Sequence, residues 1–171
     1  MAKFRDITLA MDLSLNGPGF AVLAVEPTTN KPILLDVRSL VLTRHKLRSE
    51  KLNETYELIK TLISTYAPDH IVREKGFSKF PATTQALFSV VGVSELATLH
   101  AGVSVKPLEY TPANVKKVVT GKGKASKADV QLAVESQLQL KQGFLMNDDE
   151  SDACAVGLTH LYKLKLAKKH E

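Results

Sequence analysis

The sequence predicts an α/β fold with a mixed five-stranded sheet, three antiparallel strands followed by parallel strands, flanked by helices. Two observations predict it. Three apolar segments near the N-terminus are separated by short turns, which forces neighbouring strands to run antiparallel. The later apolar segments alternate with amphipathic ones, the order that favours parallel strands joined by helices. At 171 residues the chain can bury one core, so we expect a single domain over residues 1–171 with a flexible tail from about residue 167.

The N-terminal segments carry the expected antiparallel strands. Their apolar runs are continuous, which is typical of strands that are buried on both faces. NGPG at 16–19 and TTNKP at 28–32 are strong turn sequences between these runs. We therefore expect strands over Ile7–Ser14, Phe20–Pro27 and Ile33–Leu42.

The rest of the chain alternates between helices and strands. Apolar residues recur at three- and four-residue steps from about Arg48 to Tyr66, which predicts an amphipathic helix that ends before Pro68. The same reasoning predicts two more strands, over His70–Glu74 and Val103–Tyr110. We expect the remaining helices over about Ala82–Ala101, Pro112–Val119, Lys127–Leu138 and Asp148–Leu166.

Four carboxylates crowd the start of the last expected helix, in the sequence MNDDESDACAVGLTH at 146–160. Asn147 and Glu150 have the spacing of a capping box, which gives both a structural role. Asp149 and Asp152 are three residues apart and share one helical face. Capping does not explain Asp152, because it precedes small apolar residues and needs a partner or a metal ion there.

Two further acids lie at strand positions. Asp12 interrupts the first apolar strand, where it has an ordinary explanation as the cap of the next turn. Glu74 ends a later strand, where it can pair with Arg73 or Lys75. In a sheet of this order, however, both strand ends can meet the acidic helix start at one edge, and converging carboxylates suit Mg²⁺ or Mn²⁺ rather than zinc. We expect two divalent ions, acting in phosphodiester hydrolysis, on Asp12, Glu74, Asp149 and Asp152.

Basic residues concentrate in NVKKVVTGKGKASK at 114–127, which contains five lysines and no acid. By itself this segment is equally well explained as a solvated loop. The net charge of +5 favours a polyanionic partner without proving one. Beside a metal cluster, binding to a phosphate backbone is the better interpretation. We expect catalytic contacts to the scissile phosphate from Lys116 and Lys127, and DNA-backbone contacts from Lys117, Lys122 and Lys124.

The segment EKGFSKFPATTQ at 74–85 places two phenylalanines in a loop. Phe80 precedes Pro81 and is expected to fold back onto the core as a staple for the next helix. Phe77 is freer, and we expect it to stack on a base at an opened DNA junction. Lys79 is expected to contact the DNA beside it.

Together these residues resemble the RuvC-type Holliday junction resolvases, of the divergent kind carried by bacteriophages, over about Thr8–Tyr162. Asp12 falls at the first-strand aspartate of that family. REKGF resembles the segment with a catalytic glutamate and an exposed phenylalanine three residues later. The stretch NVKKVVTGKGKASKADVQ resembles the one that joins two lysines of the catalytic face, and DDESDACAVGLTH resembles the final helix start. Leu13 and Ser14 depart from the pattern, because the family usually has Asp-Pro-Gly on its first strand.

The resemblance implies a ribonuclease H-like fold and a Mg²⁺-dependent endodeoxyribonuclease, with Mn²⁺ as a substitute. It implies a homodimer that makes paired nicks in four-way junctions, and it leaves forks open as further substrates. The apolar segment ALFSVVGVSELATLHAG at 86–102 fits a dimer interface, although it fits a buried helix equally well. The catalytic roles carried over are those of Asp12, Glu74, Asp149, Asp152, Lys116 and Lys127, and Phe77 takes the exposed aromatic role.

Three alternatives stay open. A ribonuclease H or another nuclease with a different substrate shares the metal chemistry. A non-catalytic DNA-binding protein with the same fold is the second alternative, although such a protein would not need all four acids. The segment Met11–Leu23, an acid on a strand before a Gly-rich turn, also fits an actin-like phosphotransferase, but one domain of this length lacks the second lobe of those proteins.

Composition sets the remaining limits. Cys154 is the single cysteine, which excludes an intramolecular disulfide and a cysteine-based zinc site. No apolar run approaches the length of a membrane span, and the N-terminus does not resemble a signal peptide. We therefore expect no membrane partner and a cytoplasmic protein, in the cytoplasm of the host if a phage encodes it.

Overall fold

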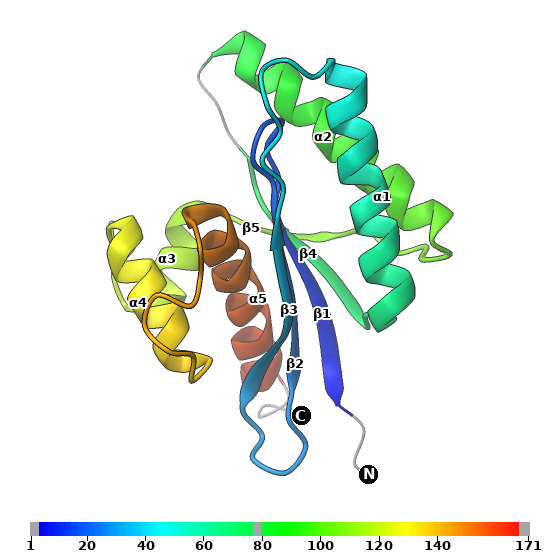
Figure 1. The fold of residues 1–171 in the computed structure, drawn as a ribbon. Coiled ribbons are helices and arrows are strands. Elements are labelled where there is room, and N and C mark those ends of the chain that lie inside the picture. The colour runs from blue at the N-terminus through cyan, green and yellow to red at the C-terminus, as the bar shows by residue number, and fades with distance from the viewer. Residues whose placement is uncertain (1–3, 77–79, 168–171) are drawn as a thin grey trace.

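The structure is a computed structural model that describes residues 4–76 and 80–167. A five-stranded sheet of order β3-β2-β1-β4-β5 lies between two groups of helices (Figure 1). The strands are β1 (Arg5–Asp12), β2 (Gly19–Val25), β3 (Pro32–Ser39), β4 (His70–Glu74) and β5 (Leu108–Tyr110). The helices are α1 (Arg48–Tyr66), α2 (Pro81–His100), α3 (Pro112–Thr120), α4 (Lys127–Gln137) and α5 (Asp148–Ala167).

The pairing of the strands is that of the predicted mixed sheet. β1 pairs with β2 and β2 with β3 in antiparallel registers, as the short turns require. β4 and β5 extend the sheet on the other side of β1 in parallel registers. The helices agree with the predicted ranges to within a residue or two, and this confirms the expected fold class and element order.

The first three strands end earlier than predicted. β1 stops at Asp12, β2 at Val25 and β3 at Ser39, so their expected continuations to positions 14, 27 and 42 are wrong. The chain leaves the ladder after β3 because residues 40–42 bond to the turn after β1. The Leu40 N–H donates to the Pro18 carbonyl at 3.1 Å, and the Leu42 N–H donates to a carbonyl of the same turn at 2.9 Å.

β5 is also shorter than predicted. It covers three residues, Leu108–Tyr110, whereas the apolar pattern predicted a strand from Val103. Pro107 immediately precedes β5, and proline has no N–H to donate to a ladder. The sheet therefore ends in a short parallel edge strand beside β4.

The two faces of the sheet have separate hydrophobic cores. Along β1, Met11 belongs to the core that contains α1 and α2, and Ala10 belongs to the core that contains α5. Because side chains alternate along a strand, Asp12 faces α5 with Ala10. The same alternation puts Glu74 on the face of Val72, which also packs toward α5. Both strand acids thus face the layer of α3, α4 and α5 (Figure 1).

The longest helices of the fold are not apolar throughout. α2 and α5 are the longest, at 20 residues each, and both carry polar residues along their length. Over the residues that the structure describes, we find no helix with the length and apolar character needed to cross a bilayer.

Candidate active site at the ends of β1 and β4

Asp12 and Glu74 are the last residues of neighbouring parallel strands. Met11 pairs with Arg73 across the two strands, so the two acids occupy the next position of the same register. They line one cleft of about 530 Å³, together with residues 13–16, the start of α2 and Pro112. The predicted meeting of these two strand ends is therefore present in the fold.

The start of α5 is fixed by a network of side chains. Asn147 Oδ1 accepts from the Glu150 N–H at 2.9 Å, and Glu150 Oε2 accepts from the Met146 N–H at 2.8 Å. This is a capping arrangement as predicted, with the glutamate reaching one residue further back. Ser39 of β3 donates to Glu150 Oε1 at 3.1 Å and accepts from Asn147 Nδ2 at 2.8 Å. The first turns of α5, which carry Asp149 and Asp152, are thereby tied to the sheet.

Each of the four predicted carboxylates lies within electrostatic range of at least two of the others. Burial, followed by repulsion from Asp152 and Asp149, raises the pKa of Asp12 to about 7. Burial, followed by repulsion from Asp12 and Asp152, raises the pKa of Glu74 to about 7. Burial is also the main cause that raises the pKa of Asp149 and of Asp152. Acids from three separate segments of the chain thus share one site.

The turn after β1 packs directly on Asp149. A Cβ atom on Gly19 would lie 2.0 Å from the Asp149 carbonyl oxygen, and one on Gly17 would lie 2.9 Å from Asp149 Oδ2. Only residues without a side chain permit this approach. The sequence pattern identified this segment as a turn, but the contact with Asp149 was not predicted from it.

Ser14 closes the same turn. Its Oγ accepts from the Gly17 N–H at 2.9 Å in a local serine turn, at a position where the sequence departs from the family pattern. Lys51 of α1 is buried and donates to Asn16 Oδ1 at 2.6 Å. The residues between β1 and β2 are therefore held from both ends, and this keeps Gly17 and Gly19 against Asp149.

Two lysines from α3 and α4 approach the acids. Lys127 Nζ lies 2.9 Å from Asp148 Oδ2 and 3.9 Å from Asp152 Oδ2. The hydrogen bond with Asp148 is the main cause that raises the pKa of Lys127. Lys116 Nζ donates to the Ala125 carbonyl at 3.0 Å. Its positive charge partly offsets the rise in the pKa of Glu74 and of Asp152. The structure thus brings both predicted catalytic lysines to the acidic cluster.

The other predicted DNA contacts lie further out. Lys117, Lys122 and Lys124 are exposed on α3 and on the connection to α4. Phe77 and Lys79 lie outside the described residues. Phe80 is 71% exposed at the N-cap of α2, so its expected packing onto the core is wrong. Pro81 starts the helix and leaves Phe80 just outside it.

The donor set suits a hard divalent cation. All four acids offer carboxylate oxygens, the ligands that Mg²⁺ and Mn²⁺ take in proteins. A cation would also relieve the repulsion that contributes to the raised pKa of Asp12 and of Glu74. As the side chains of residues 4–76 and 80–167 are placed, no three from His, Cys, Asp or Glu converge tightly enough to hold an ion.

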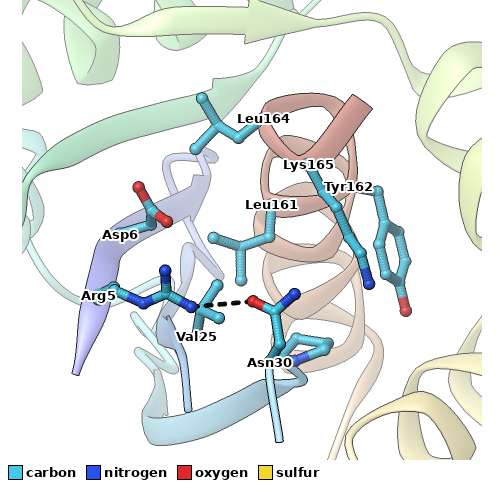
Figure 2. Close-up of a pocket in the computed structure, with 9 residues that line it drawn as sticks. Arg5, Asp6, Val25, Asn30, Leu161, Tyr162, Leu164 and Lys165 are labelled. Atoms are coloured by element: carbon cyan, nitrogen blue, oxygen red, sulfur yellow. Dashed lines mark hydrogen bonds between the residues drawn. The ribbon is translucent and has the colours of Figure 1, made fainter. Parts of the chain in front are cut away.

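A second cavity, of about 270 Å³, lies at the opposite end of the sheet (Figure 2). Arg5 Nη2 donates there to Asn30 Oδ1 at 2.9 Å, and Val25 and Leu161 contribute apolar surface. Among the described residues that line it, Asp6 is the one carboxylate. This cavity lacks the converging acids of the cleft, so we place the candidate active site at the ends of β1 and β4.

Known proteins resemble this chain over most of its length. Residues 8–160 match the family described as Crossover junction endodeoxyribonuclease RuvC. The chain is 35% identical over 156 residues to the RuvC protein of Clostridioides difficile, which covers 88% of this chain and 90% of the relative. It is 32% identical over 153 residues to that of Prochlorococcus marinus, which covers 90% and 94%.

The fold is similar to solved structures of the same family. Thermus thermophilus RuvC in complex with a Holliday junction substrate aligns with a TM-score of 0.84 at 23% identity, over 95% of this chain and 97% of that one. The ribonuclease H-like fold expected from the resemblance is confirmed by this match. Because the family match spans most of the chain, and the identities hold over nearly the whole length of the relatives, this chain belongs to the RuvC family of crossover junction endodeoxyribonucleases.

Proposed function

We propose that this chain is a structure-selective DNA endonuclease that resolves Holliday junctions by paired nicks, with forks as further candidate substrates. The observation that carries the proposal is the acidic site at the ends of β1 and β4, where Asp149 and Asp152 repel Asp12, and Asp12 and Asp152 repel Glu74. Lys127 lies 3.9 Å from Asp152 at the same site. Membership of the RuvC family supports the reaction. The similar Thermus thermophilus protein was solved in complex with a Holliday junction substrate, which supports the same substrate class here.

In this proposal Asp12, Glu74, Asp149 and Asp152 hold two Mg²⁺ ions, for which Mn²⁺ can substitute. When bound, such ions activate a water molecule and stabilise the leaving 3′ oxygen. The protein contributes a buried, oriented set of carboxylates, with α5 fixed by Ser39 and Glu150. Lys116 and Lys127 neutralise charge on the pentavalent phosphate, since both already lie within electrostatic range of these acids.

The DNA-binding surface in this proposal extends from the cleft along α3 and α4. Lys117, Lys122 and Lys124 contact phosphates of the duplex arms, supported by their exposure. Phe77 stacks on a base at the opened junction and Lys79 contacts the strand beside it. Replacing Phe77 with alanine should therefore reduce the rate of junction cleavage more than the affinity for linear duplex.

A homodimer is part of the proposal, because paired nicks need two active sites. α2 supports it by exposing apolar side chains, with Phe88 at 67% and Leu99 at 56%, while it buries Val90 and Ala97. Residues 1–171 act in this proposal as a single nuclease domain. The proposal includes the bacteriophage-encoded branch of the family that the sequence resembles, and such a protein would work in the host cytoplasm.

The test is incubation of the protein with labelled four-way junctions, forks and linear duplexes in Mg²⁺ or Mn²⁺, with cut positions mapped on every strand. We expect symmetric nicks at the branch point of the junction and little cutting of duplex. The matched control is Asp12→Asn, which should bind the junction and leave it uncut. Full nicking by that variant would rule out the assigned site.

The same assay separates the alternatives. Preferred cutting of an RNA–DNA hybrid would favour a ribonuclease H activity. Junction binding without cutting in any metal would favour a non-catalytic DNA-binding protein. Tight ATP binding by calorimetry, without affinity for junctions, would favour a phosphotransferase.

A further inference from the structure

We infer that the connection between β3 and α1 is a second DNA-binding surface, which contacts a different arm of a branched DNA from the one bound by α3 and α4. This inference rests on the proposed function. The segment is Thr43–Arg48, which we call the basic connection. It reads TRHKLR and has no acid until Glu50. Its basic members are Arg44, His45, Lys46 and Arg48.

The basic connection is joined to the active site through the backbone. Residues 40–42 lead into it, and the N–H groups of Leu40 and Leu42 donate to carbonyls of Pro18 and Asn16. This is the turn that packs against Asp149 through Gly17 and Gly19. Figure 1 shows the connection from β3 to α1 at the same end of the sheet as the start of α2. It therefore borders the cleft that holds the carboxylates.

Two of the basic side chains have structural partners. Lys46 forms an ion pair with Glu54 of α1. Arg48 donates to the Gln85 carbonyl at 3.0 Å and also contacts Ser89, both on α2. These contacts hold the basic connection against the two helices that cover this face of the sheet.

The other two basic side chains are available to a ligand. Arg44 and His45 are both exposed. Among the residues that the structure describes, no ion pair or hydrogen bond involves either side chain. A segment that presents an unpaired guanidinium and a hydrogen-bonding imidazole to solvent, next to the cleft, is complementary to a second stretch of DNA backbone.

The position of the basic connection indicates that its partner is branched DNA. The lysines of α3 and α4 lie on the α5 side of the sheet, whereas the basic connection leads into α1 on the other side (Figure 1). The carboxylates lie between the two. A branched DNA seated at the carboxylates sends arms in several directions, so two of its arms can meet both basic surfaces at once. Val41, two residues before the segment, and Leu47, within it, are 82% and 68% exposed and offer apolar contact to sugars or unstacked bases.

The test compares Arg44→Gln and the double variant Arg44→Gln/His45→Gln with the wild type. Binding to a labelled four-way junction and to a linear duplex is measured at several salt concentrations in a chelator, so that no cutting occurs. We expect the double variant to bind the junction about three- to tenfold more weakly, and the slope of log K against log salt to fall by about 0.9 for each lost phosphate contact. Duplex affinity should change less.

Two matched controls accompany these variants. Lys31→Gln removes an exposed lysine from the turn before β3, at the other end of the sheet, and should leave both affinities unchanged. Arg44→Lys keeps the charge and should retain the wild-type salt slope. If the double variant behaves like Lys31→Gln, or loses duplex and junction affinity equally, the inference is wrong while the proposed function stands. If the wild type neither binds nor cuts branched DNA, the proposed function is wrong, and the inference that rests on it is wrong as well.

Discussion

Asp12 is an acidic residue whose charged form is disfavoured by the surrounding protein. Burial and the repulsion of Asp152 and Asp149 both act to keep its carboxyl group protonated, and its pKa rises to about 7. Ionisation of Asp12 at neutral pH therefore lowers the free energy of unfolding. This loss is compensated only when a cation or a proton neutralises the site.

The first prediction concerns the pH dependence of stability. The pKa of Asp12 is raised in the folded state, so its contribution to stability is complete below about pH 3.8 and is lost as the pH rises toward 7. In a chelator, Asp12→Asn should therefore raise the free energy of unfolding by about 1–3 kcal/mol at pH 8, with little effect at pH 4. Urea denaturation of both proteins at several pH values measures this. Equal stabilities at pH 8 would contradict the raised pKa.

The second prediction concerns Gly19. A Cβ atom there would overlap the Asp149 carbonyl oxygen at 2.0 Å, and this neighbour is backbone that cannot rotate away. Gly19→Ala should destabilise the protein by about 1–3 kcal/mol and displace Asp149 enough to reduce junction cleavage at least tenfold. Gly92→Ala is the control, because no atom lies within 4 Å of a Cβ at that position. Thermal unfolding and single-turnover cleavage rates distinguish the two variants.

At the scale of elements, α5 depends on contacts with the sheet for its orientation. Ser39, on the edge strand β3, bonds to both Asn147 and Glu150 at the first turn of the helix. Glu150 is 8% exposed, so loss of a partner leaves a largely buried carboxylate with fewer hydrogen bonds. The edge strand and the acidic helix thus form one structural unit, although more than 100 residues separate them in sequence.

The third prediction tests this unit. Ser39→Ala should lower the free energy of unfolding by about 1–2 kcal/mol, because it removes two hydrogen bonds at a part-buried site. The rate of junction cleavage should fall with it, whereas junction affinity should hold, because the lysines proposed to bind DNA lie elsewhere. Ser39→Thr keeps the hydroxyl and should retain most of the activity. An unchanged cleavage rate in Ser39→Ala would show that α5 keeps its orientation without this contact.

The fourth prediction concerns the connection between α3 and α4. Lys124 is exposed there, outside the acidic cluster. Lys124→Ala should weaken junction binding modestly, about two- to fivefold, and lower the slope of log K against log salt by about 0.9. The cutting rate at saturating protein should not change. Titrations at several salt concentrations check both the affinity and the slope.

The sequence alone was enough to predict the order of strands and helices. It was not enough to predict individual contacts between distant residues. Short turns and intervening helices determine that β1 is next to β4, and with it that Asp12 and Glu74 share an edge. The approach of Gly19 to Asp149 and the ion pair of Lys127 with Asp148 could not be predicted in this way. Such contacts join residues distant in the chain and depend on how α4 and α5 pack, which periodicity does not specify.

At the scale of the whole molecule, the acidic cleft links stability to ions in solution. Ligands that bind only the folded state stabilise it in proportion to their concentration and affinity. The fifth prediction is that Mg²⁺ or Mn²⁺, added at millimolar concentration at pH 7.5, raises the melting temperature by several degrees. The shift should be abolished by a chelator and reduced in Asp12→Asn. An equal shift in wild type and variant would indicate that the ions bind elsewhere.

Lys127 gives the protein a cation of its own at this cleft. Its ammonium group lies between Asp148 and Asp152 and offsets part of their charge without any dissolved ion. We therefore expect the protein to fold without a metal ion and, in the proposed function, to bind DNA in a chelating buffer. A rapid-mixing experiment that adds the ion would then start cleavage in every molecule at once, so that the order of the two proposed nicks could be timed directly.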